Sequence, residues 1–169
     1  MRYRTLLLWV SLLIPAMASA TLPELAPVIR AAQPVGSAQL RAWWMDIYTA
    51  SFWSDSGSWQ KTPYALSLTY AMGFTPEEMA DRTAKEMKRV SSLSADARAA
   101  YARQLKAIWP EIMAGDRLTA LAQQDRTSFY HNGRLVGSID GPEFMQAFFA
   151  IWLSPDSSEP GMQRQLLTP

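Results

Sequence analysis

The stretch Tyr64-Ala-Leu-Ser-Leu-Thr-Tyr70, followed by Thr75-Pro-Glu-Glu78, is the part of the chain that decides its fold class. Over residues 64–70 large apolar side chains alternate with smaller ones, and a period of two predicts a half-buried strand. The Thr75 hydroxyl can accept a hydrogen bond from the backbone N–H of Glu78, whose side chain can return to Thr75. Pro76 suits the first helical position because its missing N–H costs nothing there. The stretch therefore predicts a strand that leads into a helix.

Two helices are expected after this strand. The first has its inward positions at helical spacing, at Met79, Thr83, Met87 and Val90. Its Glu86 and Arg89 are expected to pair on an exposed face. Ser94 is a typical cap for the second helix, which ends near Pro110.

Three further strands and a last helix follow. Residues 118–122, 127–131 and 134–139 are expected to be strands, and Asn132-Gly133 predicts a tight hairpin turn between the last two, because both residues tolerate positive φ. Asp140-Gly-Pro-Glu143 repeats the pattern of cap, proline and acid. The helix at 144–153 is apolar on almost every side, so we expect it to be buried. A short helix is expected near 161–167.

The segment before residue 64 also has an extended pattern. Residues 21–34 contain three prolines and predict little regular structure. From Gln39 to Trp53 large apolar residues occupy both parities, which indicates a long strand that is either covered on both faces or interrupted by a bulge. Runs of strands and runs of helices, without strict alternation, predict an α+β fold with an antiparallel sheet.

Composition excludes several function classes. The 169 residues include 16 Lys+Arg and 15 Asp+Glu, so charge gives no reason to expect a nucleic-acid partner. The absence of cysteine excludes disulfides and thiolate zinc sites, and the single histidine, His131, is expected to be an exposed turn residue. No phosphate-binding glycine loop or dinucleotide fingerprint is present. We expect no metal and no cofactor.

The first twenty residues have the features of an export signal. Arg2 and Arg4 precede a short apolar run, Leu6–Ile14, and Ala18-Ser-Ala20 is a typical cleavage site. The run is too short to cross a bilayer, which takes about 20 apolar residues. We expect a signal peptide at 1–20, cleavage after Ala20, and a periplasmic or secreted single domain at 21–169 without a transmembrane span.

Asp46 is the acidic residue with the fewest ordinary explanations. It lies inside an apolar extended run, so its carboxylate must face solvent, pair with a cation such as Arg41, or line a pocket. Trp44, Tyr48 and Phe52 share its parity. All four side chains could therefore face one cavity.

Several segments together resemble a known family. They are the run ending Ile47-Tyr-Thr-Ala-Ser-Phe-Trp53, then Tyr64–Tyr70 before Thr75-Pro-Glu-Glu-Met79, and later Ala114-Gly-Asp-Arg-Leu118, Phe129-Tyr-His-Asn-Gly-Arg134, Gly141-Pro-Glu-Phe144 and Phe148-Phe-Ala-Ile-Trp-Leu153. In order and spacing they resemble the bacterial, exported branch of the chalcone isomerase-like proteins. The resemblance implies an open-faced β-sandwich, with a large antiparallel sheet covered by a helical layer.

The resemblance predicts the fold, but it does not predict the reaction of the plant enzymes. Plant members close a chalcone to a flavanone with a strand threonine, an arginine before it, and a tyrosine and an asparagine on a helix. In this chain the threonine position corresponds to Asp46, the helix positions fall among Glu78, Met79, Lys85 and Glu86, and Arg30 and Arg41 are both candidates for the arginine. Other members bind fatty acids or act as accessory proteins.

The resulting expectation is a non-catalytic protein that binds a small apolar, fatty-acid-like molecule in a strand–helix cleft. The expected site consists of Trp44, Asp46, Tyr48, Met79, Arg82, Phe144 and Phe148. Asp46 would repel a carboxylate, so the head group is expected to be neutral, or to be a carboxylate held by Arg41 or Arg82. One alternative is an isomerase of the intramolecular lyase type with Asp46 as acid or base, and another is an interaction protein with a filled core, whose protein partner the sequence does not identify.

Overall fold

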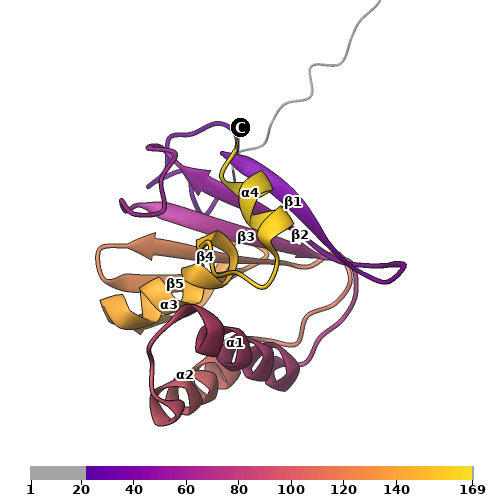
Figure 1. Cartoon of the computed structure of the whole chain (residues 1–169). Coiled ribbons are helices and arrows are strands. Elements are labelled where there is room, and N and C mark those ends of the chain that lie inside the picture. Colours follow the sequence, from indigo (N-terminus) through magenta and orange to yellow (C-terminus); the bar gives the residue numbers. More distant parts are fainter. Residues whose placement is uncertain (1–21, 169) are drawn as a thin grey trace, which may run out of the picture.

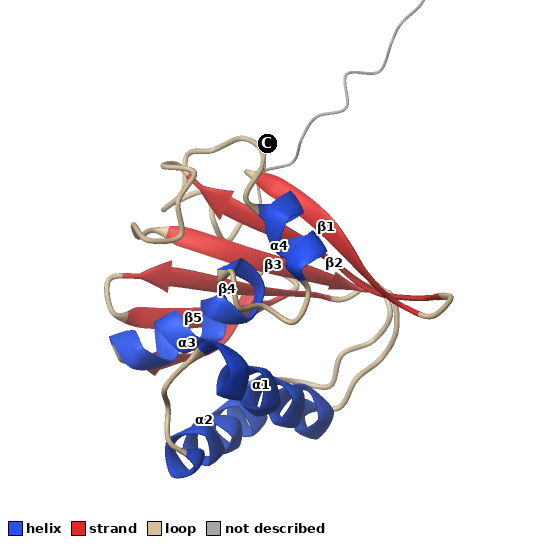
Figure 2. Ribbon diagram, in the orientation of Figure 1, coloured by secondary structure: helices blue, strands red, loops and turns tan. Residues whose placement is uncertain are grey.

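A computed structural model describes residues 22–168, and these form one large sheet with helices on one face (Figures 1 and 2). The sheet is antiparallel and its six strands follow one another in chain order. They are β1 (Gly36–Ala42), β2 (Met45–Ser54), β3 (Tyr64–Tyr70), β4 (Arg117–Gln123), β5 (Arg126–His131) and β6 (Arg134–Asp140). The helices are α1 (Pro76–Val90), α2 (Ala95–Ile108), α3 (Pro142–Leu153) and α4 (Pro160–Leu166). The α+β class and the open-faced antiparallel sheet are confirmed.

The helical layer covers the sheet unevenly. Helix α4 packs on β1, α3 packs on β5 and β6, and α1 contacts α2 and α3. The main core lies under α3, where Phe144, Phe149 and Leu153 are fully buried. No helix among residues 22–168 is both long enough and apolar enough to span a bilayer.

Strand β3 is buried on both faces rather than on one. Ala65 and Ser67 are 0% and 3% exposed, although their parity points away from the helices. A second apolar cluster covers part of that face, and Leu25 and Ile29 of the leading segment pack there against Ala65. The prediction of a half-buried strand was wrong because the covering residues lie about forty positions earlier in the chain.

The expected single strand over residues 39–53 is a hairpin. Strands β1 and β2 pair along their length and reverse at Trp43-Trp44, with a register irregularity between Leu40 and Arg41. Trp43 takes a φ of 61°, a left-handed conformation that Gly or Asn adopts more readily. The turn was missed because neither tryptophan is a turn-forming residue.

Local capping signals mostly had the predicted effect. The Thr75–Glu78 capping box and the Ser94 cap are both present. Asn132 and Gly133 have φ values of 48° and 84° in the β5–β6 turn, which fits the predicted type I′ geometry. Asp140, however, does not cap α3: it ends β6 and pairs with Arg126 at 2.6 Å, and Gly141 with a φ of 112° is the N-cap.

Candidate functional site

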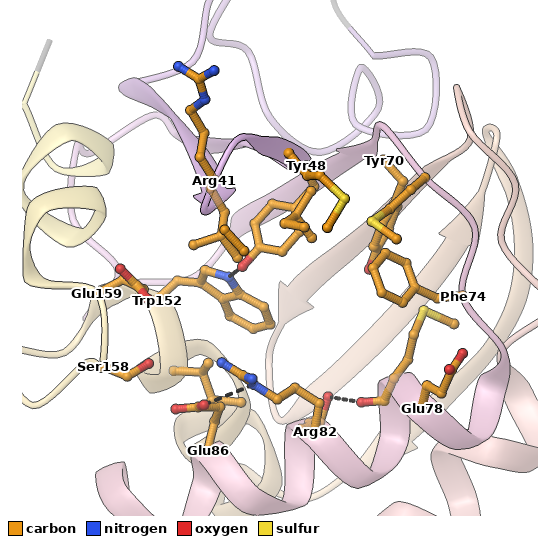
Figure 3. Close-up of a pocket in the computed structure, with 18 of the residues that line it drawn as sticks. Arg41, Tyr48, Tyr70, Phe74, Glu78, Arg82, Glu86, Trp152, Ser158 and Glu159 are labelled. Carbon is orange, nitrogen blue, oxygen red and sulfur yellow. Dashed lines mark hydrogen bonds and ion pairs between the residues drawn. The ribbon is translucent and has the colours of Figure 1, made fainter.

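A cavity of about 400 Å³ opens between the sheet and the helices, near the β1–β2 turn (Figure 3). Its walls come from the paired ends of β1, β2 and β3, from α1, and from the end of α3 with the loop into α4. Most of the lining surface is apolar, and the apolar lining residues are Leu40, Ala42, Met45, Ile47, Met72, Phe74, Met79, Ile151 and Trp152. The polar lining residues are Arg41, Tyr48, Tyr70, Glu78, Arg82, Thr83, Glu86, Ser157, Ser158 and Glu159.

Two tyrosines form the strand wall. Tyr48 and Tyr70 are opposite each other in the β2–β3 pair, and their rings meet edge to face at 5.8 Å. The Trp152 indole N–H donates to the Tyr48 hydroxyl oxygen over 3.0 Å (Figure 3). Burial raises the pKa of Tyr48 to about 12 and also raises the pKa of Tyr70. Both phenols are therefore neutral at physiological pH, and the Tyr48 O–H remains able to donate.

Helix α1 supplies the opposite wall. Met79 and Thr83 are buried one turn apart, and the Thr83 hydroxyl donates to the Met79 carbonyl at 2.8 Å. On the same helix, the Arg82 guanidinium pairs with the Glu86 carboxylate at 3.0 Å (Figure 3). The Glu86 side chain is only 13% exposed, whereas that of Arg82 is 63% exposed. The prediction of a Glu86–Arg89 pair on an exposed face was wrong, because the Glu86 side chain turns towards the cavity and pairs with Arg82, one turn earlier.

Asp46 lies outside the cavity lining. It pairs with Arg41 at 2.8 Å, and the two side chains are 45% and 61% exposed. Arg41 lines the rim, but its guanidinium points away from the cavity (Figure 3). Of the three settings expected for Asp46, the structure places it in the ion pair with Arg41.

The seven expected site residues fall into two groups. Tyr48, Met79 and Arg82 line the cavity together. Trp44 is in the β1–β2 turn and is 77% exposed, and Asp46 is in the ion pair beside it. Phe144 and Phe148 are stacked in the core with their ring centres 5.6 Å apart, and both are buried. The alternation argument failed for Asp46 because the register shift between Asp46 and Tyr48 reverses the parity of β2, so that Met45 and Ile47 line the cavity instead. It failed for Trp44 because the chain reverses there.

Sequence reasoning did not select two important residues of the wall. Tyr70 shares the parity of Tyr64 in the alternating run, but its position opposite Tyr48 depends on strand register. Trp152 belongs to an evenly apolar helix, where no single face stands out, and its partner Tyr48 is 104 positions away. Neither contact leaves a local signal in the sequence.

His131 belongs to a separate cluster at the start of β4. Its ring is 25% exposed and lies 3.1 Å from Asp116, which also accepts from the Asn132 amide at 2.8 Å. The bond from Asn132, the bond from the Met113 backbone N–H and the contact with His131 lower the pKa of Asp116 to about 2. His131 was expected to be an exposed turn residue; instead it is the half-buried last residue of β5, and its ring contacts Asp116 just before β4.

Metal-ligand chemistry has no candidate cluster in the described part of the chain: no three His, Asp or Glu side chains within it are grouped to hold an ion. The site that remains is the apolar cavity, with a hydroxyl donor on its strand wall and an ion pair on its helix wall.

Comparisons with known proteins agree with this geometry. The chalcone isomerase-like family matches residues 35–168. An uncharacterized protein of Haemophilus influenzae is 28% identical over 137 residues, which cover 80% of this chain and 67% of that protein. A crystal structure of a fatty-acid binding protein of Arabidopsis thaliana superposes with a TM-score of 0.62 at 9% identity, covering 79% of this chain and 85% of the other.

Proposed function

Because the chain belongs to the chalcone isomerase-like family, we propose that it binds a small, largely apolar, fatty-acid-like molecule in the cavity beside Tyr48. The observation that carries this proposal is the cavity itself, whose lining surface is mostly apolar and includes the half-buried Tyr48 with its hydroxyl. Its volume of about 400 Å³ lies within the usual range for small-molecule sites, about 300–1,000 Å³. The structural neighbour from Arabidopsis thaliana, a fatty-acid binding protein, makes the same ligand class a reasonable choice.

The acyl chain and the head group of the ligand would contact different parts of the cavity. An acyl chain would lie against Ile47, Phe74 and Met79, where leaving water is favourable by about 25 cal/mol per Å² of apolar surface. The Tyr48 hydroxyl accepts from Trp152 and stays protonated, so it would donate to an oxygen of the ligand. This donor would fix the orientation of an otherwise apolar molecule.

We propose that the protein is not an enzyme. Asp46 is the candidate acid or base if the protein were an isomerase of the intramolecular lyase type. That carboxylate is held by Arg41 and lies outside the cavity lining, so it is not positioned to reach a molecule bound there. The observation favours ligand binding without turnover.

We propose that the protein binds its ligand outside the cytoplasm. Residues 1–20 are proposed to be a cleaved signal peptide, a segment that lies outside the described residues, and the protein is proposed to be periplasmic or secreted. N-terminal sequencing of protein isolated from the periplasm or medium should begin at Thr21. A product that retains Met1 in the cytoplasm would refute this part of the proposal.

A matched pair of methionine variants tests the cavity. Met72 lines it, and Met113 lies on a neighbouring loop, is 62% exposed and does not line it. Met72→Trp should place an indole in the cavity and weaken binding of 1-decanol at least tenfold by calorimetry, while Met113→Trp should bind as the wild type does. Native mass spectrometry of the wild type should show a co-purifying apolar molecule. If the wild type binds no decyl compound, the filled-core interaction protein becomes the better account.

A further inference from the structure

Both cations that line the cavity are already paired. Among the described lining residues these cations are Arg41 and Arg82. Arg41 is engaged by Asp46 and directed outwards, and Arg82 is engaged by Glu86 at 3.0 Å within the helix wall (Figure 3). A ligand carboxylate would therefore meet no cation that lacks a carboxylate partner.

The remaining charges on the wall are negative. Glu78 lines the cavity and accepts from the Thr75 backbone N–H and hydroxyl in the α1 cap, at 2.8 and 2.9 Å. Glu159 lines it from the exposed start of α4. With Glu86, the cavity has three lining carboxylates and two lining guanidinium groups. The charge around a bound head group is therefore not favourable to an anion.

We infer that Glu86 determines head-group specificity: by holding Arg82, it makes the cavity select an acyl compound with an uncharged polar head, such as an alcohol, ester or amide, over a free carboxylate. This inference rests on the proposed function and specifies its ligand. It assigns Glu86 the role of a specificity-determining residue rather than a contact for the acyl chain.

The physical reason lies in the unequal exposure of the pair. Glu86 is 13% exposed, so a ligand carboxylate that displaced it from Arg82 would leave a largely buried charge without its partner. A carboxylate that shared Arg82 with Glu86 would instead be held beside a like charge in a partly desolvated site. A neutral oxygen avoids both costs, because it needs only a hydrogen-bond donor, and the Tyr48 O–H is one.

The test compares three ligands with the same ten-carbon chain. Calorimetry at pH 8 with decanoate, decanamide and 1-decanol changes the head group and leaves the apolar contacts alike. The wild type should bind decanamide and 1-decanol at least tenfold more tightly than decanoate. Glu86→Gln keeps the shape of the side chain and frees Arg82 from its charged partner, so the ratio of decanamide affinity to decanoate affinity should fall at least tenfold.

Two further variants identify the origin of the effect. Glu77→Gln removes an exposed acid of the same helix that does not line the cavity, and it should leave the ratio as in the wild type. Adding Arg82→Gln to Glu86→Gln should abolish the gain in decanoate affinity, because the freed cation is lost. Thermal unfolding of each variant verifies that it is folded.

The possible outcomes separate the inference from the proposed function. Wild-type protein that binds decanoate as tightly as decanamide, or a Glu86→Gln variant with an unchanged ratio, would overturn the inference and leave ligand binding in place. Wild-type protein that binds none of the three compounds would overturn both.

Discussion

The Glu24–Arg117 pair should stabilise the attachment of the leading segment to the sheet. The Glu24 side chain is fully buried on the face opposite the helices, and Arg117 is 27% exposed. Glu24 accepts from the Arg117 guanidinium at 3.2–3.3 Å and from the Thr119 hydroxyl at 2.8 Å. We predict that Glu24→Gln, which preserves shape and removes charge, lowers the free energy of unfolding.

The magnitude follows from the exposure of the two partners. Hydrogen bonds to charged groups contribute about 1.5–3 kcal/mol, and removing one partner of a fully buried ion pair costs about 3–5 kcal/mol. Arg117 can reach water after the substitution, and the Thr119 hydroxyl can still donate to the amide oxygen of a glutamine. We therefore expect a loss of about 2 kcal/mol, at the low end of these ranges.

Urea unfolding of a double-mutant cycle measures the interaction directly. Glu24→Gln, Arg117→Gln and the double variant should give a coupling energy of about 1–2 kcal/mol. Glu111→Gln, at an exposed position, is the control and should change stability by less than about 0.5 kcal/mol. A coupling energy near zero would refute the claim that this pair helps to hold residues 22–31 on the sheet.

Three further predictions concern the β1–β2 turn, the stability of the protein at acid pH and the lack of chalcone cyclisation. Trp43→Gly should raise the free energy of unfolding by about 0.5–1 kcal/mol, because glycine adopts the φ of 61° without strain; a lower midpoint in urea would show that the indole makes a compensating contact. The pKa of Asp116 falls from 3.8 to about 2 on folding, so its contribution to stability is present above pH 4 and is lost as pH falls towards 2. Asp116→Asn should therefore flatten the decline of stability over that window, and an unchanged slope would contradict the assignment. Purified protein should not cyclise chalcones appreciably in a spectrophotometric assay, since Asp46, the candidate acid or base, is paired with Arg41 outside the cavity lining; sustained turnover of a chalcone would restore the isomerase interpretation.

The sequence alone determined those features of the fold that depend on neighbouring residues. The capping box at Thr75, the cap at Ser94 and the Asn132-Gly133 turn all act over two or three positions, and each is present as predicted. The order of strands and helices was enough to predict an antiparallel α+β sheet. The resemblance to the chalcone isomerase-like family, whose match covers residues 35–168, then extended this local information to the complete sheet and its helices.

Tertiary structure decided everything that depends on residues far apart in the chain. The chain reverses at Trp43-Trp44, where no turn-forming residue predicts a turn, and the pairing of β1 with β2 holds this reversal in place. The Tyr48–Trp152 bond joins positions 104 residues apart, and it places a hydroxyl donor in the cavity. Phe144 and Phe148 fill the core while Tyr70 lines the cavity, because packing of α3 on the sheet selects among apolar side chains that the sequence alone cannot distinguish.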